Sequence, residues 1–443
     1  MSRSHYGSLV DKVREELVHR FLQSKQLPGS EEILTVLASE GKGKGEIPAA
    51  FYQFDQFPEL LLSRMMVDHL NVADPFFKCH EGGAGAITQI QGRQLINFSN
   101  YNYLGLNGHP RVNQAALEAM QRYGTSASAS RLVGGERPVH RQLEEALAEF
   151  YGVDDCVAMV SGHATNVNTI GHLFGPKDLI IHDHLIHNSI LEGIKLSGAA
   201  RRRFAHNDLV ALDHMLGEIR GQFERVLVVA EGLYSMDGDV ADLPGLIAIK
   251  KQHKCFLMVD EAHSLGVLGK NGGGIRDHFN MAGPEVDIWM GTLSKSLAGC
   301  GGFIAGSRSM IRLLKYSASG FVFSVGMAPP LAAASLEALR ILQEEPQRVQ
   351  RLHTLSNLFL KRAREKGIDT GLSQGFSIIP TLVGNSLKAV RLSNQLFERG
   401  IHVHAIAYPV VEEQAARLRF FVSSQHEESQ IEAAVTTLAE VLA

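Results

Sequence analysis

Residues 287–302 have the sequence Asp-Ile-Trp-Met-Gly-Thr-Leu-Ser-Lys-Ser-Leu-Ala-Gly-Cys-Gly-Gly, in which a lysine follows closely on a short apolar run. The run from Asp287 to Met290 predicts a buried strand. Lys295 comes just after it, where open α/β sheets build their binding sites. Because desolvation of an ammonium group is costly, a lysine held there can lose its proton and form a Schiff base with an aldehyde. A solvated loop lysine is the alternative for this turn taken alone.

A second stretch, residues 255–263, has the sequence Cys-Phe-Leu-Met-Val-Asp-Glu-Ala-His. Its apolar run predicts another buried strand that ends at Asp260, with His263 close behind. An aspartate at one strand end and a lysine after the next strand are what pyridoxal phosphate requires. The carboxylate keeps the pyridine nitrogen protonated, and the lysine binds the aldehyde. The two stretches together therefore predict a pyridoxal phosphate site.

The composition excludes several classes of function. The 443 residues carry 43 basic and 47 acidic side chains, a net charge of −4, and the densest basic run, Arg201–Arg203, is short enough to be a solvated strand edge. We therefore expect no nucleic-acid partner. No apolar run has the length of a membrane span, and the N-terminus lacks a signal-peptide core. The four cysteines have no spacing typical of a metal or redox site, so we expect a reduced, cytoplasmic protein without a metal.

Changes in sequence pattern along the chain predict its division into parts. From Arg111 onward, helical and strand patterns alternate, which predicts a doubly wound, mainly parallel α/β sheet followed by a smaller C-terminal α+β domain. Before it, a helical pattern and a Gly-Lys linker precede an aromatic-rich segment. The predicted parts are an N-terminal extension and linker (1–48), an N-terminal arm (49–110), a large cofactor-binding domain (111–325) and a C-terminal domain (326–443).

A turn after the strand predicted at Cys156–Val160 is a candidate phosphate site. Its sequence is Ser161-Gly-His-Ala, and a helix is predicted to begin near Asn166. The free amides at a helix N-terminus and the helix dipole both favour a bound phosphate. Taken alone the pattern is weak, because many such turns bind nothing.

Four segments together resemble the α-oxoamine synthases: Asn97–Leu106, Glu231–Asp239, Val259–His263 and Thr292–Lys295. This family of fold-type I pyridoxal-phosphate enzymes includes 8-amino-7-oxononanoate synthase, serine palmitoyltransferase, 5-aminolevulinate synthase and 2-amino-3-ketobutyrate CoA ligase. The motifs occur in the family's order between about residues 75 and 440, and the segment Glu-Gly-Leu-Tyr-Ser-Met-Asp-Gly-Asp is the most specific of them.

The resemblance implies a set of residues that bind the cofactor and carry out catalysis. Lys295 resembles the lysine that binds the aldehyde and moves the substrate proton. His187 resembles the histidine that stacks on the ring and orients the amino acid. The remaining cofactor-binding positions are Asp260 for the pyridine nitrogen, His263 and Ser235 for the phenolic oxygen, and Gly162, His163 and Thr292 for the phosphate.

The resemblance also implies residues that bind the substrate. Arg419 matches the arginine that binds the amino-acid carboxylate, and a guanidinium suits bidentate binding. Arg417 lies on the same face of the predicted strand and is an alternative. Tyr101 and Asn102 are further candidates, in a Tyr-Asn-Tyr segment that is closer to serine palmitoyltransferase than to 8-amino-7-oxononanoate synthase.

Three positions depart from the family pattern. Position 163 is commonly aromatic, whereas this chain has a histidine. The loop Gly124–Arg131 has alanines and serines in place of the usual interior glycines. In Phe321–Met327, the loop that reaches the partner subunit's phosphate in the family, Gly326 stands where a hydroxyl is common.

The implied reaction is a decarboxylative Claisen-type condensation. A small amino acid (glycine, alanine or serine) joins an acyl thioester, carried by an acyl carrier protein or coenzyme A, to give an α-amino ketone in a homodimeric enzyme. The alternatives are 8-amino-7-oxononanoate synthase or 2-amino-3-ketobutyrate CoA ligase activity, an aminotransferase or aldolase-like lyase on the same fold, and an inert partner subunit. The extension with Phe54-Asp-Gln-Phe-Pro-Glu resembles synthases associated with polyketide-type carrier proteins.

Overall fold

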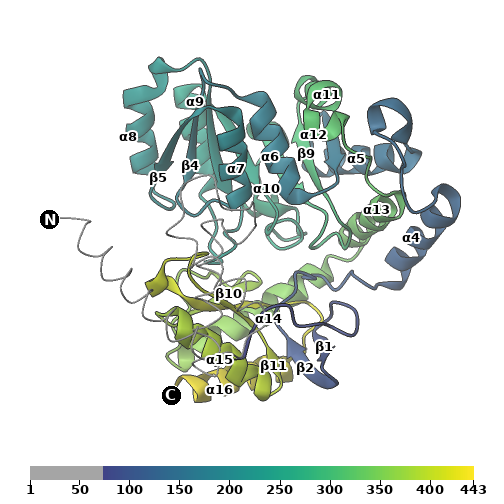
Figure 1. The fold of residues 1–443 in the computed structure, drawn as a ribbon. Coiled ribbons are helices and arrows are strands. Elements are labelled where there is room, and N and C mark those ends of the chain that lie inside the picture. Colours follow the sequence, from purple (N-terminus) through teal and green to yellow (C-terminus); the bar gives the residue numbers. More distant parts are fainter. Residues whose placement is uncertain (1–72) are drawn as a thin grey trace, which may run out of the picture. The chain divides into compact units, whose positions relative to one another are not determined.

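A seven-stranded sheet forms the centre of the fold (Figure 1). The computed structural model describes residues 73–443, and the strands are, in order across the sheet, β3 (Asp155–Met159), β9 (Gly302–Gly306), β8 (Ile288–Thr292), β7 (Phe256–Asp260), β6 (Val226–Glu231), β4 (Leu179–Asp183) and β5 (Ala200–Phe204). All except β9 point the same way, because β9 pairs antiparallel with both of its neighbours. The predicted doubly wound, mainly parallel sheet is confirmed.

The sheet separates two apolar cores. In β6, Val226 and Val228 belong to one core, and Leu227 and Val229 belong to the other. This follows because successive side chains of a strand point to opposite faces, and both faces of a parallel sheet are covered by helices. The helices of this part are α5 (Pro138–Tyr151), α6 (Gly162–Leu173), α7 (Asn188–Ser197), α8 (Leu209–Ile219), α9 (Leu243–His253), α10 (Gly274–His278), α11 (Arg308–Ser317) and α12 (Ser319–Val322).

Helix α6 begins earlier than predicted. We expected its start near Asn166, whereas it begins at Gly162, directly after the strand and turn. Ser161 is the N-cap, and its hydroxyl oxygen accepts a hydrogen bond from the amide of Ala164 at 3.3 Å. A serine in this position satisfies one of the amides that a helix start leaves unpaired, so the boundary moves to the serine.

Two smaller, three-stranded sheets lie outside the large sheet. The hairpin β1 (Ile87–Ile90) and β2 (Arg93–Asn97) turns at Gln91 and Gly92, both at positive φ, as is typical of a two-residue hairpin turn. Strand β11 (Ile401–His402) pairs parallel with β2 and joins this segment to the C-terminal region. The other sheet is antiparallel, with β10 (Ile378–Leu382), β13 (Arg417–Phe421) and β12 (His404–Ile406).

Helix α13 (Pro329–Glu344) follows the large sheet in the chain and packs against α4 (Pro110–Tyr123) and α5 (Figure 1). The remaining long helices are α14 (Gln347–Glu365), α15 (Ser386–Glu398) and α16 (Glu428–Leu442). Within residues 73–443, no helix combines the length and apolar composition needed to cross a membrane. The predicted division into parts stays a prediction, and residues 1–48 and 49–72 lie outside the described residues.

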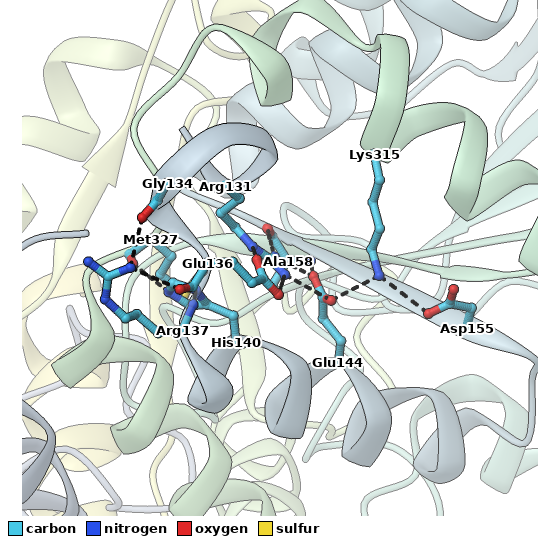
Figure 2. Close-up of polar contacts among 10 residues, drawn as sticks. All are labelled: Arg131, Gly134, Glu136, Arg137, His140, Glu144, Asp155, Ala158, Lys315 and Met327. Atoms are coloured by element: carbon cyan, nitrogen blue, oxygen red, sulfur yellow. Dashed lines mark hydrogen bonds and ion pairs between the residues drawn. The ribbon is translucent and has the colours of Figure 1, made fainter. Parts of the chain in front are cut away.

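Buried charges close one edge of the large sheet. Strand β3 is an edge strand, and Ala158 in it receives two side-chain partners. Its amide donates to Glu144 at 2.8 Å, and its carbonyl accepts from Arg131 at 3.3 Å. Arg131 and Glu144 pair with each other, and Lys315 bridges Glu144 and Asp155 (Figure 2). Charged groups at an edge prevent pairing with another strand, so this network protects the sheet.

The same region holds two loops in place. The Met327 carbonyl lies 2.7 Å from Nε2 of His140 (Figure 2), and the Gly326 amide donates to the Ala129 carbonyl at 3.0 Å. The Arg131 guanidinium lies over the Phe321 ring, 5.3 Å from its centroid. The loop Phe321–Met327 is therefore joined to the Ala- and Ser-rich loop before α5.

His206 joins the end of β4 to the segment that follows β6. Its Nδ1 lies 2.9 Å from Asp183 at the end of β4, and its Nε2 lies 2.8 Å from Asp239. Burial alone would lower the pKa of His206, but hydrogen bonds to Asp183 and Asp239 outweigh it and raise the pKa to about 10. His206 is thus a protonated link between β4 and the segment that follows β6.

We predict that this link gives a stability that depends on pH. Because the folded pKa is raised from 6.5 to about 10, the contribution is fully present below pH 6.5 and is lost as pH rises through 10. Thermal unfolding should show that His206→Gln lowers Tm most near pH 6.5 and progressively less toward pH 10. His214→Gln is the control, because that side chain is 75% exposed. A His206→Gln deficit that stays constant over this range would contradict the assignment.

Candidate active site

Polar side chains gather where the parallel strands end. Glu231 is the last residue of β6 and Asp260 the last of β7, and the two face each other in register. Lys295 follows the end of β8 by three residues. Carboxyl ends of parallel strands meet at one edge of a sheet, which is where α/β proteins bind ligands. The structure thus brings the predicted Asp260 and Lys295 together.

The environment of Lys295 favours its neutral form. Its side chain is half-buried, and Nζ lies 5.3 Å from the centroid of the Tyr101 ring. Burial lowers the pKa of Lys295 to about 8, and the Arg419 guanidinium contributes in the same direction. The carboxylates of Asp260 and Glu231 oppose the shift without reversing it. At pH 7 roughly one amine in ten is therefore unprotonated, far more than for an ordinary lysine.

Asp260 is fixed by two hydrogen bonds. It is 3% exposed; Oδ2 accepts from the Asn166 amide group at 2.8 Å, and Oδ1 accepts from the Ala262 backbone at 2.9 Å. The sequence analysis missed Asn166. Its position could have pointed to the site, because Asn166 lies one helical turn after Gly162, on the helix whose start is predicted to bind phosphate.

Glu231 is a second buried carboxyl group, and its own role was also missed. It is 3% exposed, and Oε2 accepts from the Ser235 amide at 3.2 Å. Oε1 has no hydrogen-bond partner among the described residues. Burial, followed by the neighbouring Asp260 charge, raises the pKa of Glu231 to about 8. The sequence does place Glu231 at the end of a wholly apolar strand, which pairs with the strand that ends at Asp260. That position could have marked Glu231 as a site residue.

Three predicted histidines differ in their surroundings. His263 is buried, with Nδ1 2.7 Å from the Tyr103 hydroxyl, and burial followed by the Lys295 and Arg419 charges holds its pKa well below the usual value. His187 is the N-cap of α7, and its Nδ1 accepts from the Ser189 amide at 3.3 Å. His163 is exposed, with its ring centroid 6.4 Å from that of His187.

The start of α6 forms a narrow cradle that fits a phosphate. A Cβ atom at Gly162 would lie 2.8 Å from Thr292 Oγ1, so only glycine leaves the turn this close to Thr292. Thr292 Oγ1 is also held by the Gly301 carbonyl at 3.0 Å and the Ser294 hydroxyl at 2.8 Å. Free amides at the helix start, with two hydroxyls beside them, suit the phosphate of a cofactor whose aldehyde would meet Lys295.

The segment Glu231–Asp239 joins the large sheet to the C-terminal sheet. Asp237 pairs with Arg417 on β13 at 2.7 Å, and both side chains are buried. Gly238 has φ +71°, and a Cβ there would collide with the Ile378 carbonyl of β10. Arg417, the predicted alternative for the carboxylate, is therefore already engaged.

Arg419 reaches from the same strand into the site. Its Nη1 donates to the Ser235 carbonyl at 3.0 Å, and its Nε is buried without a partner among residues 73–443. Burial is the main cause that lowers its pKa. In the described part of the chain, no carboxylate forms an ion pair with it. Arg419 is therefore a cation placed beside Ser235 with donors unused.

The two remaining predicted residues lie on one loop. Tyr101 is 39% exposed, and its ring packs against Phe421 at 4.9 Å and His263 at 5.8 Å between centroids. Asn102 is buried; its side-chain amide donates to the Ala84 carbonyl at 2.7 Å and accepts from the Asn107 backbone at 3.0 Å. The Asn102 side chain thus holds the loop, and its substrate role stays a prediction.

Known proteins are similar to this chain in sequence and in architecture. Residues 93–438 match the family described as aminotransferase class I and II. The 8-amino-7-oxononanoate synthase of Symbiobacterium thermophilum is 42% identical over 80% of this chain and 89% of its own length. That of Geobacter sulfurreducens is 40% identical over 81% of this chain and 92% of its own length.

Solved structures of serine palmitoyltransferases have a similar fold. Serine palmitoyltransferase from S. paucimobilis, with bound PLP and myriocin, has a TM-score of 0.85 at 27% identity, covering 89% of this chain and 98% of that chain. The Sphingomonas wittichii enzyme has a TM-score of 0.84 at 29% identity, with the same coverage. The resemblance to the α-oxoamine synthases is confirmed, and the chain belongs to the aminotransferase class I and II family of pyridoxal-phosphate enzymes.

Proposed function

We propose that the protein condenses a small amino acid with an acyl thioester to give an α-amino ketone, carbon dioxide and a free thiol. Relatives near 40% identity that are named 8-amino-7-oxononanoate synthase, and structural neighbours named serine palmitoyltransferase, support this class. The observation that carries the proposal is the position of Arg419. Its unused donors lie beside Ser235, near the lysine and the carboxylates at the strand ends.

The residues at the strand ends would hold pyridoxal phosphate in one orientation. The start of α6, with Gly162, His163 and Thr292, would bind the phosphate. Asp260 would hold the pyridine nitrogen, while Lys295 would bind the aldehyde. The phenolic oxygen is assigned to His263 and Ser235, and the ring face to His187. When bound, the cofactor supplies stabilisation of the negative charge at the amino acid's α-carbon.

The side chains of this protein would then direct the bond changes. Arg419 binds the amino-acid carboxylate and fixes the α-carbon. Lys295 Nζ accepts the α-proton, which its pKa of about 8 allows near neutral pH. The α-carbon forms a bond to the thioester carbonyl carbon, and the thiolate leaves with a proton. The carboxylate leaves as carbon dioxide, and a proton takes its place.

Two narrower activities belong to the same class. 8-Amino-7-oxononanoate synthase activity would use one particular acyl group, and 2-amino-3-ketobutyrate CoA ligase activity another. The relatives named 8-amino-7-oxononanoate synthase favour the first. An aminotransferase or aldolase-like lyase would use the amino acid without any thioester, and an inert subunit would convert neither substrate.

The direct test is a matrix of substrates with the full-length enzyme. Glycine, alanine and serine are each mixed with acyl groups presented on coenzyme A and on an acyl carrier protein, and products are identified by mass spectrometry. We expect an α-amino ketone, with one carbon dioxide and one thiol released per turnover. Products that form without any thioester would contradict the proposed class.

The variant Lys295→Ala tests whether Lys295 binds the cofactor aldehyde. It should fold normally but lose covalently held cofactor and turnover, whereas Lys270→Ala, at an exposed position, should keep both. Borohydride treatment followed by peptide mass spectrometry locates the modified lysine. Turnover by Lys295→Ala at the wild-type rate would overturn the assignment.

We infer that the protein works as a homodimer. Large apolar side chains are exposed together near the loop Phe321–Met327, among them Val133 at 82% and Phe323 at 86%. Exposed apolar groups of this size are typical of an interaction surface. In the family, this loop reaches the phosphate of the partner subunit, which supports the assignment of the surface to a second copy.

Light scattering should give the mass of two chains for the wild-type protein. Negative charges introduced on this surface should separate the two chains. The double variant Val133→Glu, Phe323→Glu should therefore be a monomer that holds the cofactor less tightly. Val210→Glu is the control, since Val210 is also 82% exposed but lies on α8. An active wild-type monomer would refute the inference.

A further inference from the structure

His404 lies directly across a strand pair from Arg419. Strands β12 and β13 are antiparallel, and His404 and Arg419 are partners in their register. Side chains opposite each other in such a pair share one face, with Cβ atoms about 5 Å apart. Because Arg419 reaches the Ser235 carbonyl from this face, His404 is placed on the side of the sheet that serves the active site.

Both side chains have unused hydrogen-bonding capacity. Arg419 Nε is buried without a partner, and the ring nitrogens of His404 make no hydrogen bond to any residue in the described chain. Burial lowers the pKa of His404 to about 4, and the charges of Arg419, His80 and Lys78 contribute in the same direction. The imidazole is therefore neutral at pH 7, with one N–H to donate.

Arg419, the charged member of this pair, forms no ion pair with a carboxylate among residues 73–443, although the charge of Glu231 acts on it. The groups that influence His404 are Arg419 on β13 and Lys78 and His80 before β1, and the ring of His402 lies 5.0 Å away. Arg417, by contrast, has Asp237 as its partner. Among residues 73–443, no set of three or more His, Cys, Asp or Glu side chains is arranged to hold a metal ion. The chemical group that fits these donors is a carboxylate.

We propose that His404 donates a hydrogen bond to the carboxylate that Arg419 binds, and so helps the enzyme to select amino acids over simple amines. This rests on the proposed function, because it assigns that carboxylate to the amino-acid substrate. The guanidinium supplies two parallel donors, and the imidazole supplies a third from the neighbouring strand. A carboxylate has enough lone pairs to accept all three.

The test compares His404→Leu, which removes the donor, with His404→Gln, which keeps one. The holoenzyme is titrated with the amino acid among glycine, alanine and serine that binds best, and separately with ethanolamine, which lacks the carboxylate. The change in visible absorption gives both Kd values without any turnover. The Leu variant should bind the amino acid about 10-fold more weakly, as expected for one hydrogen bond to a charged group. Binding of ethanolamine should be unchanged, and the Gln variant should recover most of the loss.

Steady-state kinetics add a second readout. In the Leu variant KM for the amino acid should rise, while kcat and KM for the thioester stay near wild type. His214→Leu is the control at an exposed position. If His404→Leu fails to fold, His404→Ala replaces it with the same expected outcomes. An unchanged ratio of the two Kd values, or equal losses for the Leu and Gln variants, would overturn the role of His404.

The two proposals fail in different ways. If the wild-type enzyme binds the amino acid but makes no ketone from any thioester, the proposed function is wrong, and the Kd comparison still decides whether His404 contacts the carboxylate. If the ketone forms and the Kd ratio is insensitive to His404, only the present inference is wrong.

Discussion

The burial of four charged groups at one edge of the sheet is the constraint on which the site depends. Asp260 and Glu231 end neighbouring strands, and Lys295 and Arg419 approach them from a turn and from the C-terminal sheet. Burial disfavours every charge, so the pKa of the lysine falls and that of Glu231 rises. Both shifts favour neutral groups. A neutral amine is what an aldehyde requires, so this environment suits the proposed role of Lys295 in binding the cofactor.

The segment after β6 connects this chemistry to substrate binding. Its residues pair with His206 on one side and with Arg417 on the other, while its Ser235 carbonyl holds Arg419. A single short segment therefore fixes Arg419, the proposed carboxylate-binding residue, relative to the strand ends proposed to hold the cofactor. Asp237 and Gly238 serve to bring two sheets together, and neither has to touch the substrate.

Much of the fold could be predicted because its signals are local. The apolar runs that end at Asp260 and before Lys295 are buried strands in one sheet, as expected. The antiparallel direction of β9 could not be predicted, since Gly302–Gly306 has the same apolar pattern as a parallel strand. Helix α6 begins at Gly162 rather than near Asn166, because Ser161 caps the first turn.

The site could be predicted less completely, because many of its contacts join distant segments. Asn166 supports Asp260 from 94 positions away, and His404 meets Arg419 only through strand pairing. Spacing on the predicted helix places Asn166 near the phosphate turn, but no local pattern pairs it with Asp260 or pairs His404 with Arg419. The two arginines of β13 lie on one face of the predicted strand, and in the structure Arg417 pairs with Asp237 while Arg419 reaches the Ser235 carbonyl. Conversely, Asn102 carries a family motif, but its amide is engaged in its own loop.

The most direct test of this account is the pKa of Lys295 in the enzyme freed of cofactor. The rate at which Lys295 bonds to added pyridoxal phosphate is followed from pH 6 to 11 by borohydride trapping and mass spectrometry, with exposed Lys270 as the internal reference. The account predicts a midpoint for Lys295 near the lowered value of about 8, and a higher midpoint in Arg419→Met, where a neighbouring positive charge is removed. A midpoint near the ordinary lysine value of 10.5, unchanged by Arg419→Met, would contradict it.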